Sequence, residues 1–189
     1  MIKPTMTVYI GIDPGMHGAV ALRCEKEVTL FDIMTVKSKT ISGNNVKETS
    51  DIDIMGVVAL VSQIRQIAGA AKIVAVCEYS AGMAYTATAN RERHHDSPKT
   101  AWKTGYNFGV IRAIFHANGI PFRATPRPGD WKRFMHLTDS TLTYNDKKEK
   151  ARQMAIEMFP DAAWQLKRKK DSDRAEALLL TVWAERKGL

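Results

Sequence analysis

The sequence has only two cysteines, Cys24 and Cys77, in 189 residues. Each lies in an apolar run typical of a strand, so both are expected to be reduced thiols of the core rather than parts of a disulfide or a metal site. No apolar run approaches the roughly 20 residues of a membrane span, and the first residues lack the apolar segment of a signal peptide. These absences predict a cytoplasmic protein without a membrane partner.

Acidic residues are also scarce relative to basic ones. The chain carries 28 lysines and arginines against 20 aspartates and glutamates, a formal net charge of +8. Residues 99–170 alone hold 15 basic and 6 acidic residues, with the basic ones gathered in RPGDWKRF, KKEKAR and KRKK. Clustered cations of this kind favour a surface that binds phosphate groups. The alternative is a basic surface that only keeps the protein in solution, and charge alone does not decide between them.

What the sequence does contain is a succession of strand and helix patterns without internal repeats. Three short strands in antiparallel succession are predicted over residues 7–13, 19–24 and 28–34. Residues 35–52 are rich in Ser, Thr, Asn, Gly and Lys, and we expect them to form a long exposed loop. A helix follows over residues 53–69, with Asp51 or Asp53 as its N-cap.

The rest of the chain predicts two more strands, separated and followed by helices. AKIVAVCEYS is a continuous apolar strand of the kind that is buried on both faces, and IPFRAT is a short second one. Helices are expected over residues 98–118, from RPGDWKRFM onward, over NDKKEKARQMAIEMF, and over the last segment, capped by Asp171 or Ser172. We therefore predict one α/β domain over residues 1–189, with a mixed sheet of three antiparallel strands followed by two parallel strands, flanked by helices.

Two of the predicted strands end in a carboxylate. Asp13 follows the apolar run of the first strand and precedes Pro-Gly, and Glu78 follows VAVC. If these strands are parallel neighbours, both acids leave the sheet at the edge where ligands of open α/β sheets bind. Asp173 and Glu176 stand three residues apart and so share one face of the last helix. The alternative for this pair is an ordinary role as caps or partners of the helix dipole.

Four carboxylates gathered in one place repel one another unless a cation neutralises them. An oxygen-rich, histidine-poor ligand set suits Mg²⁺, with Mn²⁺ as a substitute. Two such ions about 3.5–4 Å apart can activate a water molecule and stabilise the leaving oxygen of a phosphodiester. The pattern thus favours a site with two metal ions that hydrolyses phosphodiesters.

Five motifs follow one another along nearly the whole chain: GIDPG with a later GA, VAVCE, P…DWKRF, a lysine-rich helix ending in FP, and DRAEALLL. Their order resembles that of RuvC-like Holliday junction resolvases, especially the phage-type branch. The resemblance implies an RNase H-like fold, a homodimer, and Mg²⁺-dependent paired nicking of a four-way or otherwise branched DNA junction. It also implies the cytoplasm of a bacterium or of a phage-infected host.

Position by position, the resemblance implies four catalytic metal ligands, which map to Asp13, Glu78, Asp173 and Glu176. It implies that Lys148 is a further catalytic residue near the scissile phosphate, although KKEK permits a shift of one residue. Together with the basic runs, it leads us to expect DNA contacts at Lys132, Arg133, Lys147, Lys148 and Arg112.

The sequence departs from the family pattern at two positions. Glu176 stands where many relatives have Asp, which adds a methylene to one ligand. Ala81 stands where cellular members have an aromatic residue that stacks at the junction, and Tyr79, Met83 and Tyr85 are the candidate substitutes. The 35–52 segment also looks longer than its equivalent in the cellular branch.

Several other residues have competing interpretations. Residues 94–96, His-His-Asp, favour a solvated loop over a metal site, since no further ligand has matching spacing. Trp102, Tyr106 and Phe108 are too close together for one helical stripe, so core or dimer packing is expected for at least two of them, with base stacking as the alternative.

Three more residues are given structural roles only. Asp32 is expected to face solvent, and Trp131 to anchor the basic turn by packing. Asp171 competes for one ligand position, but it lies five residues before Glu176 and therefore off the face that carries Asp173.

Other functions compete with a branched-DNA endonuclease. An actin-like sugar kinase or ATPase also begins with a GID-x-G loop, but that fold needs two such domains and 189 residues are too few. A catalytically inactive branched-DNA binding protein fits the same motifs, as does a related RNase H-like nuclease that acts on flaps or RNA hybrids.

Overall fold

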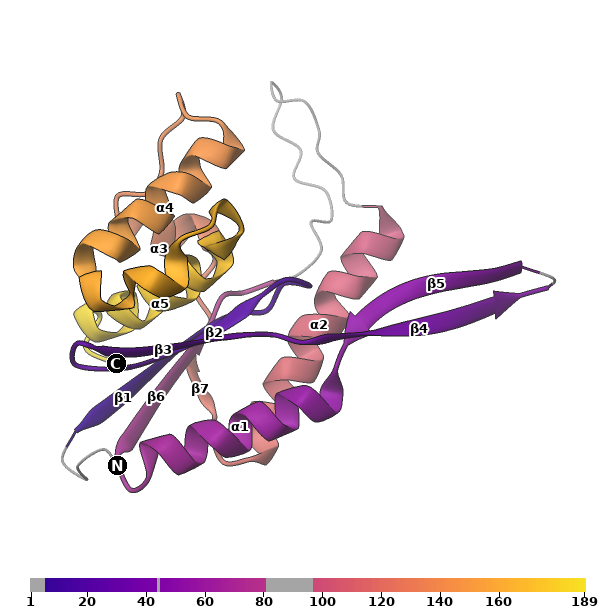
Figure 1. Cartoon of the computed structure of the whole chain (residues 1–189), viewed down its shortest axis with the longest axis horizontal. Helices are drawn as coiled ribbons and strands as arrows, with labels where there is room; N and C mark the ends of the chain where they lie inside the picture. Colours follow the sequence, from indigo (N-terminus) through magenta and orange to yellow (C-terminus); the bar gives the residue numbers. More distant parts are fainter. Residues whose placement is uncertain (1–5, 44, 81–96) are drawn as a thin grey trace.

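The computed structural model describes residues 6–43, 45–80 and 97–189. Its centre is a five-stranded mixed sheet in the order β3-β2-β1-β6-β7 (Figure 1). The strands are β1 (Thr7–Asp13), β2 (Ala19–Cys24), β3 (Glu27–Asp32), β6 (Lys72–Cys77) and β7 (Phe122–Ala124). Antiparallel pairing joins β3, β2 and β1, whereas β6 is parallel to both β1 and β7. The predicted α/β class and mixed sheet are confirmed.

Helices cover both faces of this sheet (Figure 1). One face packs against α1 (Ile54–Ala68) and α2 (Pro98–Ala117). The other face packs against α3 (Pro128–Phe134), α4 (Tyr144–Met158) and α5 (Ser172–Arg186), with the short 3₁₀ helices η1 (Pro160–Leu166) and η2 (Lys169–Asp171) between α4 and α5. Within the described ranges, no helix combines the length and apolar character that crossing a membrane requires.

Helix α1 follows its sequence pattern closely. Its buried residues recur every three or four positions and form one apolar stripe: Val57, Val61, Ile64 and Ala68. The side chain of Asp53 accepts a hydrogen bond of 2.9 Å from the N–H of Gly56, so Asp53 is the N-cap and Asp51 is not. The same apolar layer contains Cys24 and Cys77, which are buried and free as predicted.

Strand β1 and helix α5 are in direct contact at Gly11. A Cβ at this position would lie 2.0 Å from the backbone oxygen of Ala177, so a side chain here would push the helix away. Leu178, Leu179 and Leu180 of α5 are completely buried. This packing fixes the first turns of α5 beside the end of β1.

Residues 35–52 are not the long loop that their composition predicts. They form β4 (Thr35–Ser42) and β5 (Asn45–Ile52), an antiparallel hairpin that makes a separate two-stranded sheet and projects from the body of the protein (Figure 1). Valine, isoleucine and threonine in both strands favour this conformation, and Gly43 adopts φ +57° beside the turn. Both faces of the hairpin are exposed to water, so polar residues occur on both and hide the alternation of apolar and polar residues that indicates a strand. We call β4 and β5 the arm.

Candidate active site

Two of the predicted acids lie side by side at one edge of the sheet. Strands β1 and β6 are parallel neighbours with Ile12 opposite Cys77, and the N–H of Glu78 donates a hydrogen bond of 2.9 Å to the carbonyl oxygen of Ile12. Asp13 and Glu78 therefore leave the sheet at the carboxyl ends of neighbouring strands, as the sequence predicts.

The turn after Asp13 holds its carboxylate in place. The N–H of Gly15 donates to Oδ1 of Asp13 at 3.1 Å, and the N–H of Gly18 donates to the carbonyl oxygen of Gly15 at 2.9 Å. A Cβ at Gly18 would lie 2.1 Å from the backbone oxygen of Asp13. The glycines thus allow a turn tight enough to fix an acid at the end of a buried strand.

Helix α5 brings the other two acids to the same edge. Asp173 and Glu176 lie in its first turns, and Glu176 is buried with 5% of its surface exposed. Both are close enough to Asp13 for their negative charges to raise its pKa. The four predicted carboxylates therefore converge from three elements: β1, the end of β6, and α5.

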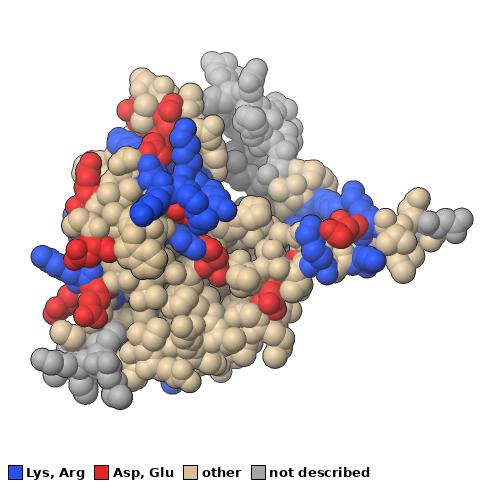
Figure 2. All heavy atoms as spheres, viewed as in Figure 1, with Lys and Arg blue, Asp and Glu red and all other residues tan. Residues whose placement is uncertain are grey.

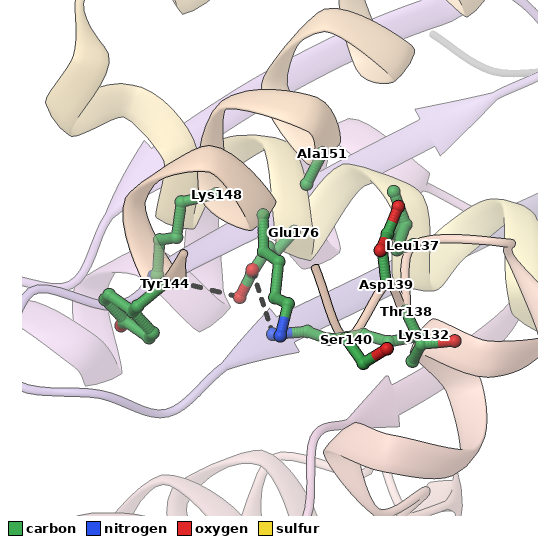
Figure 3. A pocket seen from close by; sticks show the side chains of 10 residues that line it. Lys132, Leu137, Thr138, Asp139, Ser140, Tyr144, Lys148, Ala151 and Glu176 are labelled. Atoms are coloured by element: carbon green, nitrogen blue, oxygen red, sulfur yellow. Dashed lines mark hydrogen bonds and ion pairs between the residues drawn. The ribbon is translucent and has the colours of Figure 1, made fainter. Parts of the chain in front are cut away.

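Two lysines pair with the acids of α5, and Figure 3 shows both of them beside Glu176. Nζ of Lys132, from α3, lies 2.9 Å from Oε1 of Glu176. Nζ of Lys148, from α4, contacts Oδ1 of Asp173 and lies 3.8 Å from Oε2 of Glu176. The structure places both lysines against the carboxylates, and their predicted contacts with DNA stay predictions.

Trp131 contributes a contact that the sequence analysis missed. Its side chain is entirely buried, which confirms its predicted packing role, and its Nε1–H also donates a hydrogen bond of 2.6 Å to Oε2 of Glu78. A buried indole N–H requires an acceptor. The sequence offered one sign of this contact, the position of Trp131 directly before Lys132. The tryptophan orients one of the four acids.

The electrostatics of the site follow from this crowding. Burial, followed by the charges of Glu78, Glu176 and Asp173, raises the pKa of Asp13 to about 7. Burial likewise raises the pKa of Glu78. Burial alone would lower the pKa of Lys148, but the neighbouring acids, Glu176 first among them, raise it above its ordinary value. The site therefore carries an excess of negative charge that attracts cations.

The donor set matches a hard divalent cation in kind: four carboxylates, no sulfur and no imidazole. Within the described part of the chain, no three acidic, histidine or cysteine side chains stand close enough together to hold a metal as they lie. The ammonium groups of Lys132 and Lys148 lie against Glu176 and Asp173, respectively. A metal ion would take over from these lysines the role of neutralising the acids.

Hollows lie on both sides of Lys148 and Tyr144. One, of about 450 Å³, is lined by Lys132, Lys147, Ser140 and Glu176 among others (Figure 3). The second, of about 670 Å³, is lined by residues that include His17, Arg168, Lys170 and Asp173. Tyr144 borders both hollows and is 72% exposed. The sequence analysis did not identify it as a candidate site residue. Glu176 thus borders the first hollow and Asp173 borders the second.

The predicted DNA contacts are not all in one place. Lys132, Lys147 and Lys148 border the first hollow, and Arg133 is exposed on α3 with Asp130 at 3.8 Å. Arg112 is exposed on α2, which packs on the opposite face of the sheet. Figure 2 shows a further dense group of Lys and Arg side chains over the segment that leads into α5.

The candidate stacking residues have different outcomes. Tyr79 is 43% exposed and meets Phe108 edge to face, with 5.7 Å between ring centroids. The prediction of core packing is confirmed for Phe108. It is wrong for Trp102 and Tyr106, which are exposed and stack on each other with 5.2 Å between ring centroids. Dimer packing and base stacking stay predictions. Ala81, Met83, Tyr85 and residues 94–96 lie outside the described residues.

The two remaining acids line the second hollow together with Asp173, but each is paired with an arginine. Asp171 is buried and bound by Arg168, with Oδ1 at 2.7 Å from the guanidinium, so it does not compete as a ligand. Asp32 is exposed as predicted and pairs with Arg174 at 2.6 Å.

The sequence matches no protein-family model and no curated protein. The functional interpretation therefore depends on the motifs and on the geometry of the four carboxylates.

Proposed function

We propose that this protein is a metal-dependent, structure-selective DNA endonuclease of the RuvC-like type, which resolves four-way or other branched junctions by paired phosphodiester hydrolysis. The observation that carries the proposal is the convergence of Asp13, Glu78, Asp173 and Glu176 at the carboxyl edge of the sheet. The mixed sheet order is compatible with an RNase H-like fold. Basic residues around the acids support a polyanionic substrate.

The four acids divide into two kinds of ligand. Asp13 and Glu78 are fixed, by the N–H of Gly15 and the indole of Trp131 respectively. Asp173 and Glu176 are held by lysines. Two Mg²⁺ ions, for which Mn²⁺ can substitute, would supply an activated water molecule and neutralise the charge that develops on the phosphate.

The lysines have a role of their own in this proposal. Lys148 and Lys132 lie against the acids by their ammonium groups, and Lys148 borders both hollows. When the acids bind metal, these ammonium groups are free to face the phosphate of the bound strand. Lys148 then stabilises the scissile phosphate, and Lys132 binds the backbone beside it.

Paired incision requires two active sites, and the chain has one set of the four acids. We therefore propose a homodimer, in which each protomer cuts one of two strands. Sedimentation equilibrium at micromolar concentration tests this directly: a dimer is expected, and a monomer both with and without junction DNA would contradict it.

A second candidate is a branched-DNA binding protein without catalytic activity. It is favoured by one observation, the neutralisation of Glu176 and Asp173 by lysines of the chain itself. Such a protein would bind a junction equally well with and without divalent cations and would never cut it.

A cleavage assay separates the two candidates. The substrate is an end-labelled synthetic four-way junction, with linear duplex, a flap and an RNA–DNA hybrid of the same sequence as comparisons. We expect symmetric nicks in Mg²⁺, none in EDTA, and none with Asp13→Asn, which should still bind the junction. Asp32→Asn is the matched control, because Asp32 is an exposed acid on β3 with its own partner, Arg174. Junction binding without any cleavage in Mg²⁺ or Mn²⁺ would favour the second candidate.

A further inference from the structure

The arm lies outside the proposed active site and needs its own explanation. In the described part of the chain, β4 and β5 pair only with each other, from Thr35–Ile52 at the root to Ser42–Asn45 at the tip. An isolated two-stranded hairpin is marginally stable in water. Its root is held by Lys103 of α2, which donates to the carbonyl oxygen of Ser50 and pairs with Asp51. The rest of the hairpin extends into solvent (Figure 1).

The arm starts at the edge of the sheet that carries the acids. Asp13, Ala19 and Asp32 lie opposite one another across β1, β2 and β3. Strand β4 begins three residues after Asp32. Each strand of the arm has 8 residues, which at about 3.3 Å per residue gives a reach of roughly 26 Å, or about eight base pairs of duplex.

The lysines of the arm are available for contact. Side chains alternate along a strand, so Lys37 and Lys39 point away from the face that carries Asp51. Lys37 pairs with Glu48 at 3.0 Å, but these side chains are 70% and 57% exposed, and such a pair contributes little. Lys39 and Lys47 have no ion-pair partner among the residues described. Figure 2 shows basic side chains on the half of the arm nearer the body.

The tip of the arm is apolar. Ile41 and Val46 lie opposite each other and are 73% and 63% exposed. By the same alternation, they share the face of Lys37 and Lys39. In the major groove, apolar side chains can contact the methyl group of thymine while cations bind the flanking phosphates. The face thus combines both kinds of contact.

We propose that the arm is a second DNA-contact element, which lies in the major groove of the duplex branch next to the cleavage site. The inference rests on the proposed function, because that function supplies the duplex. A two-stranded ribbon fits the major groove, which is about 12 Å wide. Lys37 and Lys39 reach the phosphates, and Ile41 and Val46 contact the bases. A second copy of the chain fits this face less well, because two such faces would bring like charges together.

The test compares the salt dependence of junction binding in EDTA among three variants. Each duplex branch of the junction has about 25 base pairs, which is longer than the reach of the protein's arm. The charge variant removes the two lysines that share the face of Ile41 and Val46, Lys37→Ala and Lys39→Ala. The tip variant, Ile41→Thr and Val46→Thr, keeps β-branched side chains. The control variant, Lys26→Ala and Lys72→Ala, removes exposed lysines at the opposite edge of the sheet.

We expect the charge variant to bind at least tenfold more weakly at low salt. Its slope of log affinity against log salt should be smaller by about two, since each phosphate contact contributes close to 0.9. The tip variant should bind several-fold more weakly with an unchanged slope.

Three outcomes would overturn the inference. If the charge and tip variants bind like the control variant, the arm does not contact DNA. If the charge variant becomes monomeric in sedimentation while its salt slope is unchanged, the arm contacts a second copy of the chain instead. If the unchanged protein itself does not bind the junction, the proposed function fails together with this inference.

Discussion

Nε1 of Trp131 lies 2.6 Å from Oε2 of Glu78, and the indole ring is entirely buried. The contact joins helix α3 to the end of β6. It thereby connects the basic residues of α3, Lys132 and Arg133, to one of the four acids. Hydrogen bonds to charged groups contribute more than neutral ones, and a buried N–H without an acceptor is costly. We infer that Trp131 positions Glu78.

Trp131→Phe tests this positioning role. The substitution keeps an aromatic ring in the core, although a smaller one, and removes the N–H donor. Loss of a partner that orients a metal ligand typically costs about 10- to 100-fold in metal affinity or activity. We expect the Mg²⁺ concentration for half-maximal cleavage to rise by that factor. Trp164→Phe is the control, because Trp164 is 68% exposed, and an equal change in both variants would contradict the assignment.

Asp13→Asn should stabilise the metal-free protein at high pH. The fold raises the pKa of Asp13 from 3.8 to about 7, so the folded state holds a proton that the unfolded chain releases. Folding stability of the unchanged protein therefore falls as pH rises through this window, and it is not reduced below about pH 4. Asparagine carries no charge and keeps the oxygen that accepts from Gly15.

The measurement is urea unfolding in EDTA across this pH range. We expect Asp13→Asn to be more stable by about 2 to 4 kcal/mol near pH 8 and to lose that advantage as the pH falls towards 4. Asp32→Asn should show no such gain. An advantage of Asp13→Asn that is the same at both ends of the range would argue against a raised pKa.

Lys147 and Lys148 make a matched pair. Lys148 contacts Asp173 and lies 3.8 Å from Glu176, whereas Lys147 lines the neighbouring hollow. Removing a cation that stabilises charge in the transition state typically costs about 10²- to 10³-fold in kcat. We expect this loss for Lys148→Ala, and only weaker DNA binding for Lys147→Ala. Single-turnover cleavage at saturating enzyme separates the two effects, and equal losses would remove the special role of Lys148.

Gly11→Ala should destabilise the protein. The added Cβ would lie 2.0 Å from the backbone oxygen of Ala177, which forces β1 and α5 apart. Overpacking of this kind costs about 1–3 kcal/mol or more in the free energy of unfolding. Gly105→Ala is the opposite control: Gly105 lies in α2 with nothing near its Cβ position, so alanine should stabilise by about 0.5–1 kcal/mol. Similar values for both, from urea unfolding, would contradict the close packing of α5 on β1.

The sequence predicts most of the sheet because its central strands carry an unambiguous signal. β1, β2 and β6 are short, apolar and bounded by turns, and parallel pairing of β1 with β6 follows from the helix between them. The arm was missed for the opposite reason. Its stabilising contacts are cross-strand pairs between polar residues, and neither face of it is buried enough to impose an apolar alternation.

The candidate site shows a similar division. The positions of Asp13 and Glu78 follow from where their strands end, and the shared face of Asp173 and Glu176 follows from helical spacing. The partners of these acids do not follow from any local pattern. Trp131 and Lys132 reach them from α3, which packs against α5 only in the folded chain.

The most direct test of the account is cleavage of a supercoiled plasmid that extrudes a cruciform. Paired nicks across the four-way junction convert the circle to a linear molecule, whereas single nicks only relax it. We predict a linear product in Mg²⁺ with the unchanged protein and with Asp32→Asn, and none in EDTA or with Asp13→Asn. A plasmid that stays supercoiled in both Mg²⁺ and Mn²⁺, with the protein bound to it, would contradict the proposal that these four carboxylates form the active site of a junction endonuclease.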